Sequence, residues 1–228
     1  MPRSRRLAAV AVFVLLGALA LAGCGKSQPG TAAYVGDTRY TERQLDDLLD
    51  ELRDARPGAE IAAETRGLAL SRLILLDLAR RVADARHLDV PNAAYAEYAE
   101  AAGLPASSKL VRMGAEYEAI GGAIAAKVQP VTPTEKDYQE IWNVLRKDPR
   151  LRPDVTYDVV VDVLSSDQSL PAYLGVRNAL REQATRTKVV VNPVYRPLIG
   201  TVATTTSEAA VTVLLGEDAG FVADITSG

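Results

Sequence analysis

Hydrophobic residues recur at helical spacing through the first two thirds of the chain. Leu45, Leu48, Leu49 and Leu52 fall three or four residues apart, which is the spacing of one face of an amphipathic helix. A longer segment at about 60–86 is apolar on more than one face, so it is expected to be the central helix. Three more helices are expected, with the apolar sets Tyr95, Tyr98 and Ala102; Leu110, Val111, Met113, Tyr117, Ile120 and Ile124; and Tyr138, Ile141, Trp142 and Leu145.

Polar residues mark where two of these helices begin. Thr41, followed three residues later by Gln44, fits a capping box, in which each side chain bonds the free backbone N–H of the other residue. For the last of these helices, Thr132 is the expected N-cap, Pro133 the first helical residue and Glu135 the third.

Strand patterns flank the helical region. Residues 34–40 read as two short strands around a Gly36-Asp37 turn, and in 155–163 valines alternate with polar residues, which predicts another strand. The remaining segments are expected to form a helix at 170–185, a strand at 188–191, a Thr-rich loop at 200–207, and a closing hairpin from 209–215 and 221–225. The predicted fold class is therefore α+β, mainly α.

The N-terminus has the three-part layout of a secretory signal peptide. Three arginines precede the uncharged apolar run 7–21, which is short for a membrane-spanning helix, and small residues follow it. Leu21-Ala22-Gly23-Cys24 resembles the bacterial lipobox. The resemblance implies cleavage between Gly23 and Cys24 and acylation of Cys24, with the mature protein anchored by lipid outside the cytoplasmic membrane. An ordinary signal peptide with an incidental cysteine, or an uncleaved N-terminal anchor, remains an alternative.

The organisation expected after cleavage is a tether and two folded regions. The signal peptide covers 1–23, a flexible tether 24–33, a helical domain 34–150, and a small α/β region 151–228. The formal charge of −3 becomes about −6 once the three signal arginines are lost, so a nucleic-acid partner is not expected. Cys24 is the only cysteine, which excludes a disulfide and a thiolate metal site in the mature chain.

Residue chemistry does not favour an enzyme. The single histidine, His87, stands at a predicted helix end, where the helix dipole favours it, and one histidine cannot make a two-histidine metal site. The acidic residues of the first helix lie mostly opposite its leucines, as on a solvated face. No glycine-rich phosphate loop precedes a helix. We therefore expect no catalytic residues, no metal and no cofactor.

Three short segments resemble the SurA N-terminal domain, the chaperone module of the SurA and PrsA foldases. Ala33-Tyr34-Val35-Gly36-Asp37 before a capped helix is similar to the start of that domain. Val131-Thr132-Pro133-Thr134-Glu135 looks like the opening of its later helix. Val191-Asn192-Pro193-Val194-Tyr195 resembles its closing segment, although Val194 stands where Arg is usual and Arg196 where Gly is usual. The resemblance spans about 33–195.

The resemblance implies a chaperone without isomerase activity. Only 37 residues, 155–191, stand where SurA and PrsA carry a far longer parvulin domain with two active-site histidines. The family implies a helical cradle that binds unfolded or newly exported polypeptides. Candidate contact residues are Tyr95, Tyr98, Met113, Tyr117, Tyr138 and Trp142, since Met and aromatic side chains suit adaptable apolar contacts, although for each residue taken alone a place in the core is the favoured interpretation. The alternatives are an assembly lipoprotein with one dedicated cell-envelope partner and a lipoprotein that binds a small ligand.

Overall fold

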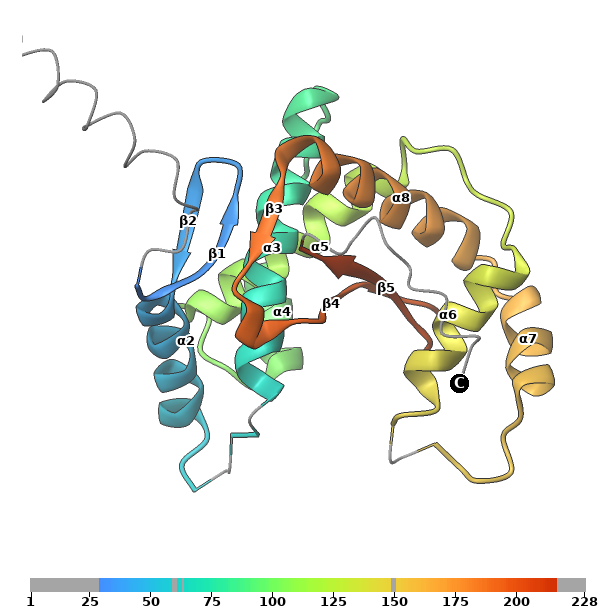
Figure 1. Ribbon diagram of the computed structural model, residues 1–228, viewed down its shortest axis with the longest axis horizontal. Helices are drawn as coiled ribbons and strands as arrows, with labels where there is room; N and C mark the ends of the chain where they lie inside the picture. Colours follow the sequence, from blue (N-terminus) through green and yellow to red (C-terminus); the bar gives the residue numbers. More distant parts are fainter. Residues whose placement is uncertain (1–28, 59–60, 63, 149–150, 217–228) are drawn as a thin grey trace, which may run out of the picture.

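The structure, a computed structural model, describes residues 29–58, 61–62, 64–148 and 151–216 (Figure 1). The expected signal peptide, the lipobox with Gly23 and Cys24, and the strand expected at 221–225 lie outside the described residues. The described part is mainly helical with a small amount of sheet, which confirms the α+β, mainly α, fold class. In chain order the elements are β1 (Thr31–Val35), β2 (Thr38–Thr41), α2 (Glu42–Ala55), α3 (Glu64–Ala85), α4 (Tyr95–Ala102), α5 (Lys109–Ala125), α6 (Glu135–Leu145), α7 (Tyr157–Ser165), α8 (Leu170–Thr187), β3 (Val189–Val191), η2 (Pro193–Tyr195), β4 (Leu198–Thr204) and β5 (Ala210–Leu215).

The three-stranded sheet joins the two ends of the described chain. Its order is β2-β1-β3, and both pairings are antiparallel. β1 begins at Thr31, so it includes the last three residues of the span 24–33 expected as a tether. Because β3 pairs with β1, and buried residues from Ala32 to Leu215 form one hydrophobic cluster, the boundary expected near residue 150 does not separate two cores.

α3 is the central helix, as its pattern predicts. Ten of its residues are buried, and it packs against α2, α5, α8, β1 and β4. The capping box of Thr41 and Gln44 at the start of α2 is confirmed, with the Thr41 N–H donating to Gln44 Oε1 at 2.7 Å. Leu45, Leu48 and Leu49 are buried on the inner face of α2. The helices expected around Tyr98, Tyr117 and 170–185 are present as α4, α5 and α8.

The start of α6 lies two residues later than the sequence suggested. Thr134, rather than Thr132, is the N-cap, and Asp137 completes the capping box by accepting the Thr134 N–H at 2.8 Å. The same carboxylate accepts a hydrogen bond from the buried Arg177 of α8 at 2.6 Å. Glu135 in the earlier register would not make this buried ion pair, so the tertiary contact selects between two similar capping sequences.

The segment expected as a strand at 155–163 is helix α7. Val160 and Leu164 are buried four residues apart, whereas Val159 and Val163 are 49% and 47% exposed. The continuous valines at 159–161 break the strict alternation, and the four-residue spacing of the buried pair is helical. α7 packs on α6, where the rings of Trp142 and Tyr157 meet edge to face at 6.3 Å.

The second sheet corrects the expected C-terminal hairpin. β5 pairs antiparallel with β4, so most of the Thr-rich segment expected as a loop is a strand. In β4 the buried residues are Leu198, Gly200 and Val202, which alternate with more exposed ones. This buried side packs on α3 and α8, whereas the alternating residues of the ribbon are exposed, as Ile199 and Thr204 are, or of intermediate burial.

Candidate functional site

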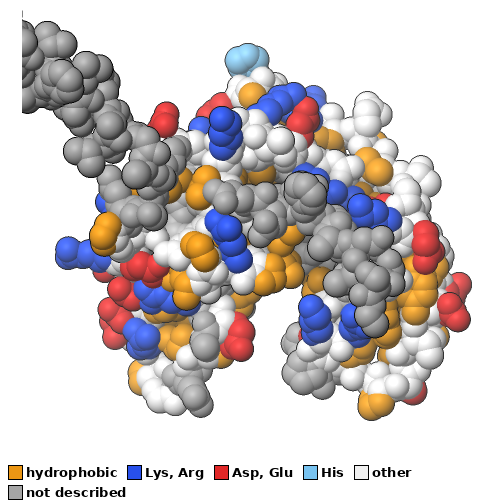
Figure 2. All heavy atoms as spheres, viewed as in Figure 1, with side chains coloured by type: hydrophobic (Ala, Val, Ile, Leu, Met, Phe, Trp, Pro, Cys, Tyr) orange, Lys and Arg blue, Asp and Glu red, His pale blue; other side chains and the backbone are white. Residues whose placement is uncertain are grey.

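The molecule is hollowed between two arms. α2 and the start of α3 form one arm, α6 and α7 form the other, and β4 and β5 lie between them (Figure 1). The space-filling view shows an open concavity at this place, with hydrophobic side chains along its inner edge near β4 (Figure 2). This concave surface is the most extended open feature on this face of the molecule.

The less buried side of the β4–β5 ribbon, which we call the floor, lies between the two arms (Figure 1). Ile199 of β4 stands opposite Leu214 of β5, and Thr201 stands opposite Thr212. All four alternate along their strands with the buried residues, and Ile199 is 41% exposed. The floor therefore offers a cross-strand apolar pair next to a pair of threonines.

A groove lies at the start of β4 beside this floor. We call it the β4 groove; its volume is about 740 Å³ and it lies between the start of α3 and the segment from η2 into β4. Six large hydrophobic residues are exposed among the described residues, and three of them, Leu68 (59%), Val194 (75%) and Ile199, line this groove. Single exposed hydrophobic residues are ordinary on a soluble protein, but their convergence in one groove indicates a binding surface.

Arg66 fixes the polar base of the β4 groove. Its guanidinium donates to Glu42 Oε2 and Asp46 Oδ1, both at 2.7 Å, and to the Tyr195 hydroxyl at 2.8 Å. Tyr195 in turn donates to Glu42 Oε2 at 2.6 Å. The pKa of Tyr195 is raised mainly by burial and, to a smaller extent, by the hydrogen bond to Glu42. The hydrogen bonds to Asp46 and Glu42 raise the pKa of Arg66. The network joins α2, α3 and η2, so the two walls of the groove are held together through side chains rather than backbone.

A smaller recess continues the apolar surface on the other side of Leu68. It has a volume of about 220 Å³ and lies between α2, α3, α4 and α5. Leucines dominate its lining, which includes Leu48, Leu49, Leu52, Leu104 and Leu110. Leu68 lines both spaces, so it is the common point of the groove and the recess.

The six aromatic and Met candidates from the sequence do not gather on one surface. Tyr95, Tyr98, Met113 and Tyr117 lie on α4 and α5, whereas Tyr138 and Trp142 lie on α6. Tyr95 is exposed, and Tyr98 lines the smaller recess. Met113, Tyr138 and Trp142 are partly buried against the core.

Tyr117 is a core residue. Its hydroxyl donates to the Val202 carbonyl at 2.8 Å, the Arg72 guanidinium lies 4.8 Å from its ring centre, and burial raises its pKa to about 12. It therefore anchors α5 to β4 beneath the floor.

Sequence reasoning missed the residues that line the β4 groove. Leu68 had a signal, because the helix around it is apolar on more than one face. Val194 and Ile199 had none, since they belong to a turn and to a strand expected as loop. Only the packing of β4 on α3 brings these three residues together.

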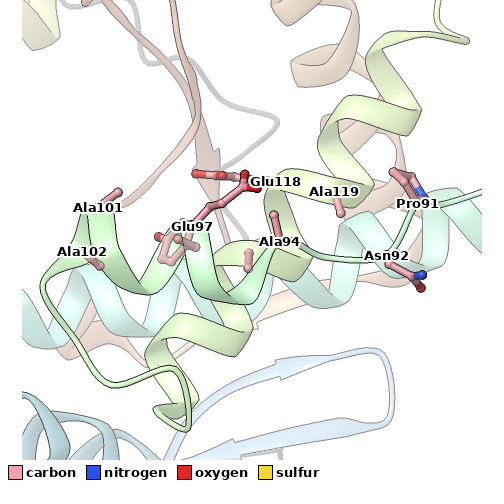
Figure 3. A pocket seen from close by; sticks show the side chains of 10 residues that line it. Pro91, Asn92, Ala94, Glu97, Ala101, Ala102, Glu118 and Ala119 are labelled. Carbon is pink, nitrogen blue, oxygen red and sulfur yellow. The ribbon is translucent and has the colours of Figure 1, made fainter.

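Another pocket, apart from the β4 groove and the smaller recess, lies between α4 and α5 and is lined by alanines and carboxylates. Its volume is about 610 Å³, and its lining includes Ala94, Ala101 and Ala119. The carboxylates of Glu97 and Glu118 lean toward one another across it (Figure 3). Two exposed carboxylates on an alanine surface form neither a nucleophile–base pair nor a metal site.

Other candidate chemistry is dispersed. His87 is exposed at the end of α3, and the acidic residues of α2 are mostly on its outer side. Among the described residues of 29–216, no three His, Cys, Asp or Glu side chains are grouped so that they could bind a metal. The helices of this same part are too short or too polar to span a bilayer.

Comparison with known proteins adds no relative: no family model matches the chain, and neither a curated protein nor a solved structure is similar to it. The fold and the site define a mainly helical α+β protein with an open, partly apolar concave surface.

Proposed function

We propose that this protein is a membrane-anchored extracytoplasmic lipoprotein that acts as a non-catalytic chaperone, and that the concave surface binds unfolded or newly exported polypeptides. The observation that carries the proposal is the convergence of Leu68, Val194 and Ile199 in the β4 groove. The lipobox at Cys24 and the resemblance to the SurA N-terminal domain support the same assignment from the sequence.

The shape and chemistry of the groove suit an extended apolar segment. The groove lies between the start of α3 and the segment that leads into β4, and a smaller apolar recess adjoins it at Leu68. Apolar contacts are non-directional, so such a surface accepts many sequences of similar hydrophobicity. A narrow polar specificity would instead require several fixed hydrogen-bonding groups pointing into the space, and the Arg66 network already bonds within itself.

Suppression of client aggregation tests this function. Residues 25–228 are mixed with a chemically unfolded client on dilution, and light scattering is followed against an inert acidic protein. We expect dose-dependent suppression near equimolar ratio, and a marked loss of it in the double variant Leu68→Ser/Ile199→Thr. The matched control is Val159→Thr/Val163→Thr, which removes two similarly exposed apolar residues from α7. Equal activity of the two double variants, each with a native circular dichroism spectrum, would contradict a role for the β4 groove.

A dedicated cell-envelope partner is the second candidate. Val159 and Val163 form a compact exposed pair one helical turn apart on α7, which is a feature of helix-docking surfaces. Crosslinking in the native membrane distinguishes the two functions: one stoichiometric partner that is lost in Val159→Thr/Val163→Thr favours assembly, and many heterogeneous products favour a chaperone.

A further inference from the structure

The folded part of the chain begins very soon after the proposed lipid attachment site. The Pro29 carbonyl accepts a hydrogen bond from the Arg39 guanidinium at 3.0 Å, and the Gly30 carbonyl accepts the N–H of Glu42 at 2.9 Å. Thr31 is buried, its hydroxyl accepts from Arg39 Nε at 2.8 Å, and its carbonyl accepts from the Asn192 side chain at 2.9 Å. Residues 29–31 are therefore bonded to β2, to the start of α2 and to the end of β3.

This attachment limits the distance between the fold and the membrane. Five peptide steps separate Cys24 from Pro29, and a fully extended chain spans at most about 3.6 Å per residue, so Pro29 lies within about 18 Å of Cys24. A 14-residue helix such as α2 is about 21 Å long, so the tether is no longer than one arm of the molecule. The fold cannot tumble freely around such an anchor.

We infer that the protein sits on the bilayer with the β1–β2 hairpin and the start of α2 against the lipid headgroups, so that the concavity opens away from the membrane. This inference rests on the lipid anchor of the proposed function. α2 begins at β2 and runs toward the open end of the concavity (Figure 1). If the start of α2 lies against the bilayer and its far end lies away from it, the concavity therefore also opens away from the bilayer.

The charge distribution along α2 selects this orientation on an anionic membrane. Arg39 and Arg43 are exposed at the end where the tether arrives, near one exposed carboxylate, Asp37. Further along the helix, the exposed Asp46, Asp47, Asp50 and Asp54 outnumber the exposed Arg53 and Arg56. Anionic headgroups attract basic side chains within about a Debye length and repel acidic ones, so the far end of α2 is held away from the surface.

Depth-dependent fluorescence quenching tests the orientation. The full-length lipidated protein is reconstituted in vesicles of phosphatidylcholine and phosphatidylglycerol that contain a lipid with a nitroxide on its headgroup. Because Cys24 is the only native cysteine and is occupied by acylation, one introduced cysteine provides the only free thiol for a fluorophore. The labelled variants are Arg43→Cys at the near end of α2, Asp54→Cys at its far end, and Arg146→Cys at the end of α6, all at exposed positions.

We expect the label at position 43 to be quenched several-fold more strongly than the labels at 54 and 146. Equal quenching at 43 and 54, with the acyl mass present on Cys24, would overturn the orientation and leave the anchor intact. Absence of the acyl mass would overturn both the anchor and the orientation. Strong quenching at 54 and 146 but not at 43 would show that the opening faces the bilayer.

Discussion

Asp167 connects the loop before α8 to the turn between β4 and β5 through side-chain hydrogen bonds. Its carboxylate accepts hydrogen bonds from the Ser169 N–H and hydroxyl and from the Thr206 hydroxyl, at 2.6 to 2.9 Å. Ser207 adds its N–H and hydroxyl at 2.9 and 2.7 Å. Burial alone would raise the pKa of Asp167, but the hydroxyls of Ser169, Ser207 and Thr206 together bring it well below its ordinary range. The ionised carboxylate thus holds the turn of the floor ribbon on the helical core.

Replacing Asp167 tests this role through stability and its dependence on pH. We expect Asp167→Asn to lower the free energy of unfolding at neutral pH by about 2 kcal/mol, because hydrogen bonds to a charged acceptor are lost or weakened. The native pKa lies below the unfolded value, so the carboxylate's stabilisation is complete above about pH 4 and declines as the pH falls toward the native pKa. Urea unfolding at a series of pH values should therefore show a smaller acid-induced loss in Asp167→Asn than in the parent protein. The exposed Asp162→Asn on α7 is the control, and an equal effect in the control would contradict the prediction.

At the scale of elements, the contact between α4 and α5 depends on one glycine. A Cβ atom at Gly114 would overlap the ring of Tyr98, so α4 lies on α5 only because position 114 has no side chain. We expect Gly114→Ala to cost about 1 to 3 kcal/mol of unfolding free energy, since overpacking forces the ring or the helix to shift. In a Tyr98→Ala background the same change should cost much less, because neighbouring sites couple.

A second glycine in α5 supplies the comparison for Gly114. A Cβ atom at Gly122 would meet nothing within 4 Å, so Gly122→Ala should stabilise the protein by up to about 1 kcal/mol through helix propensity alone. Thermal and urea unfolding of Gly114→Ala, Gly122→Ala, Tyr98→Ala and the Tyr98→Ala/Gly114→Ala double variant measure both effects. If Gly114→Ala is stabilising like Gly122→Ala, the described packing of Tyr98 on α5 is wrong.

The elements predictable from the sequence are those whose signals are local. The capping box at Thr41 and the leucine stripe of α2 sit within one helix, and both predictions are confirmed. α7 was misread because its valines and aspartates fit two periods, and only its packing on α6 decides between them. The start of α6 was displaced because the choice between Thr132 and Thr134 depends on Arg177, forty residues away from Asp137.

At the scale of the whole molecule, the candidate site could not be read from the sequence because it is made by distant segments. Leu68 comes from α3, whereas Val194 and Ile199 follow β3, and the packing of β4 on α3 brings these segments together. Aromatic character was a poor guide, since Tyr117 proved to be a core residue. The β4 groove depends on β4 forming a strand in which Ile199 is exposed, which a Thr-rich sequence did not indicate.

The proposed membrane anchor depends on Cys24, and replacing this residue tests the anchor directly. We expect the full-length protein to incorporate an alkyne fatty acid during growth and to begin at residue 24 by mass spectrometry, whereas Cys24→Ser should incorporate none. The same substitution should leave the unfolding temperature of the folded part unchanged, because the hydrophobic core of the described residues is formed by side chains from Ala32 to Leu215. Ser27→Ala, which alters the same short tether outside the lipobox, is the control and should be labelled normally. Fatty-acid label retained in Cys24→Ser would contradict acylation at this cysteine, and an unlabelled parent protein cleaved at another position would identify an ordinary signal peptide instead.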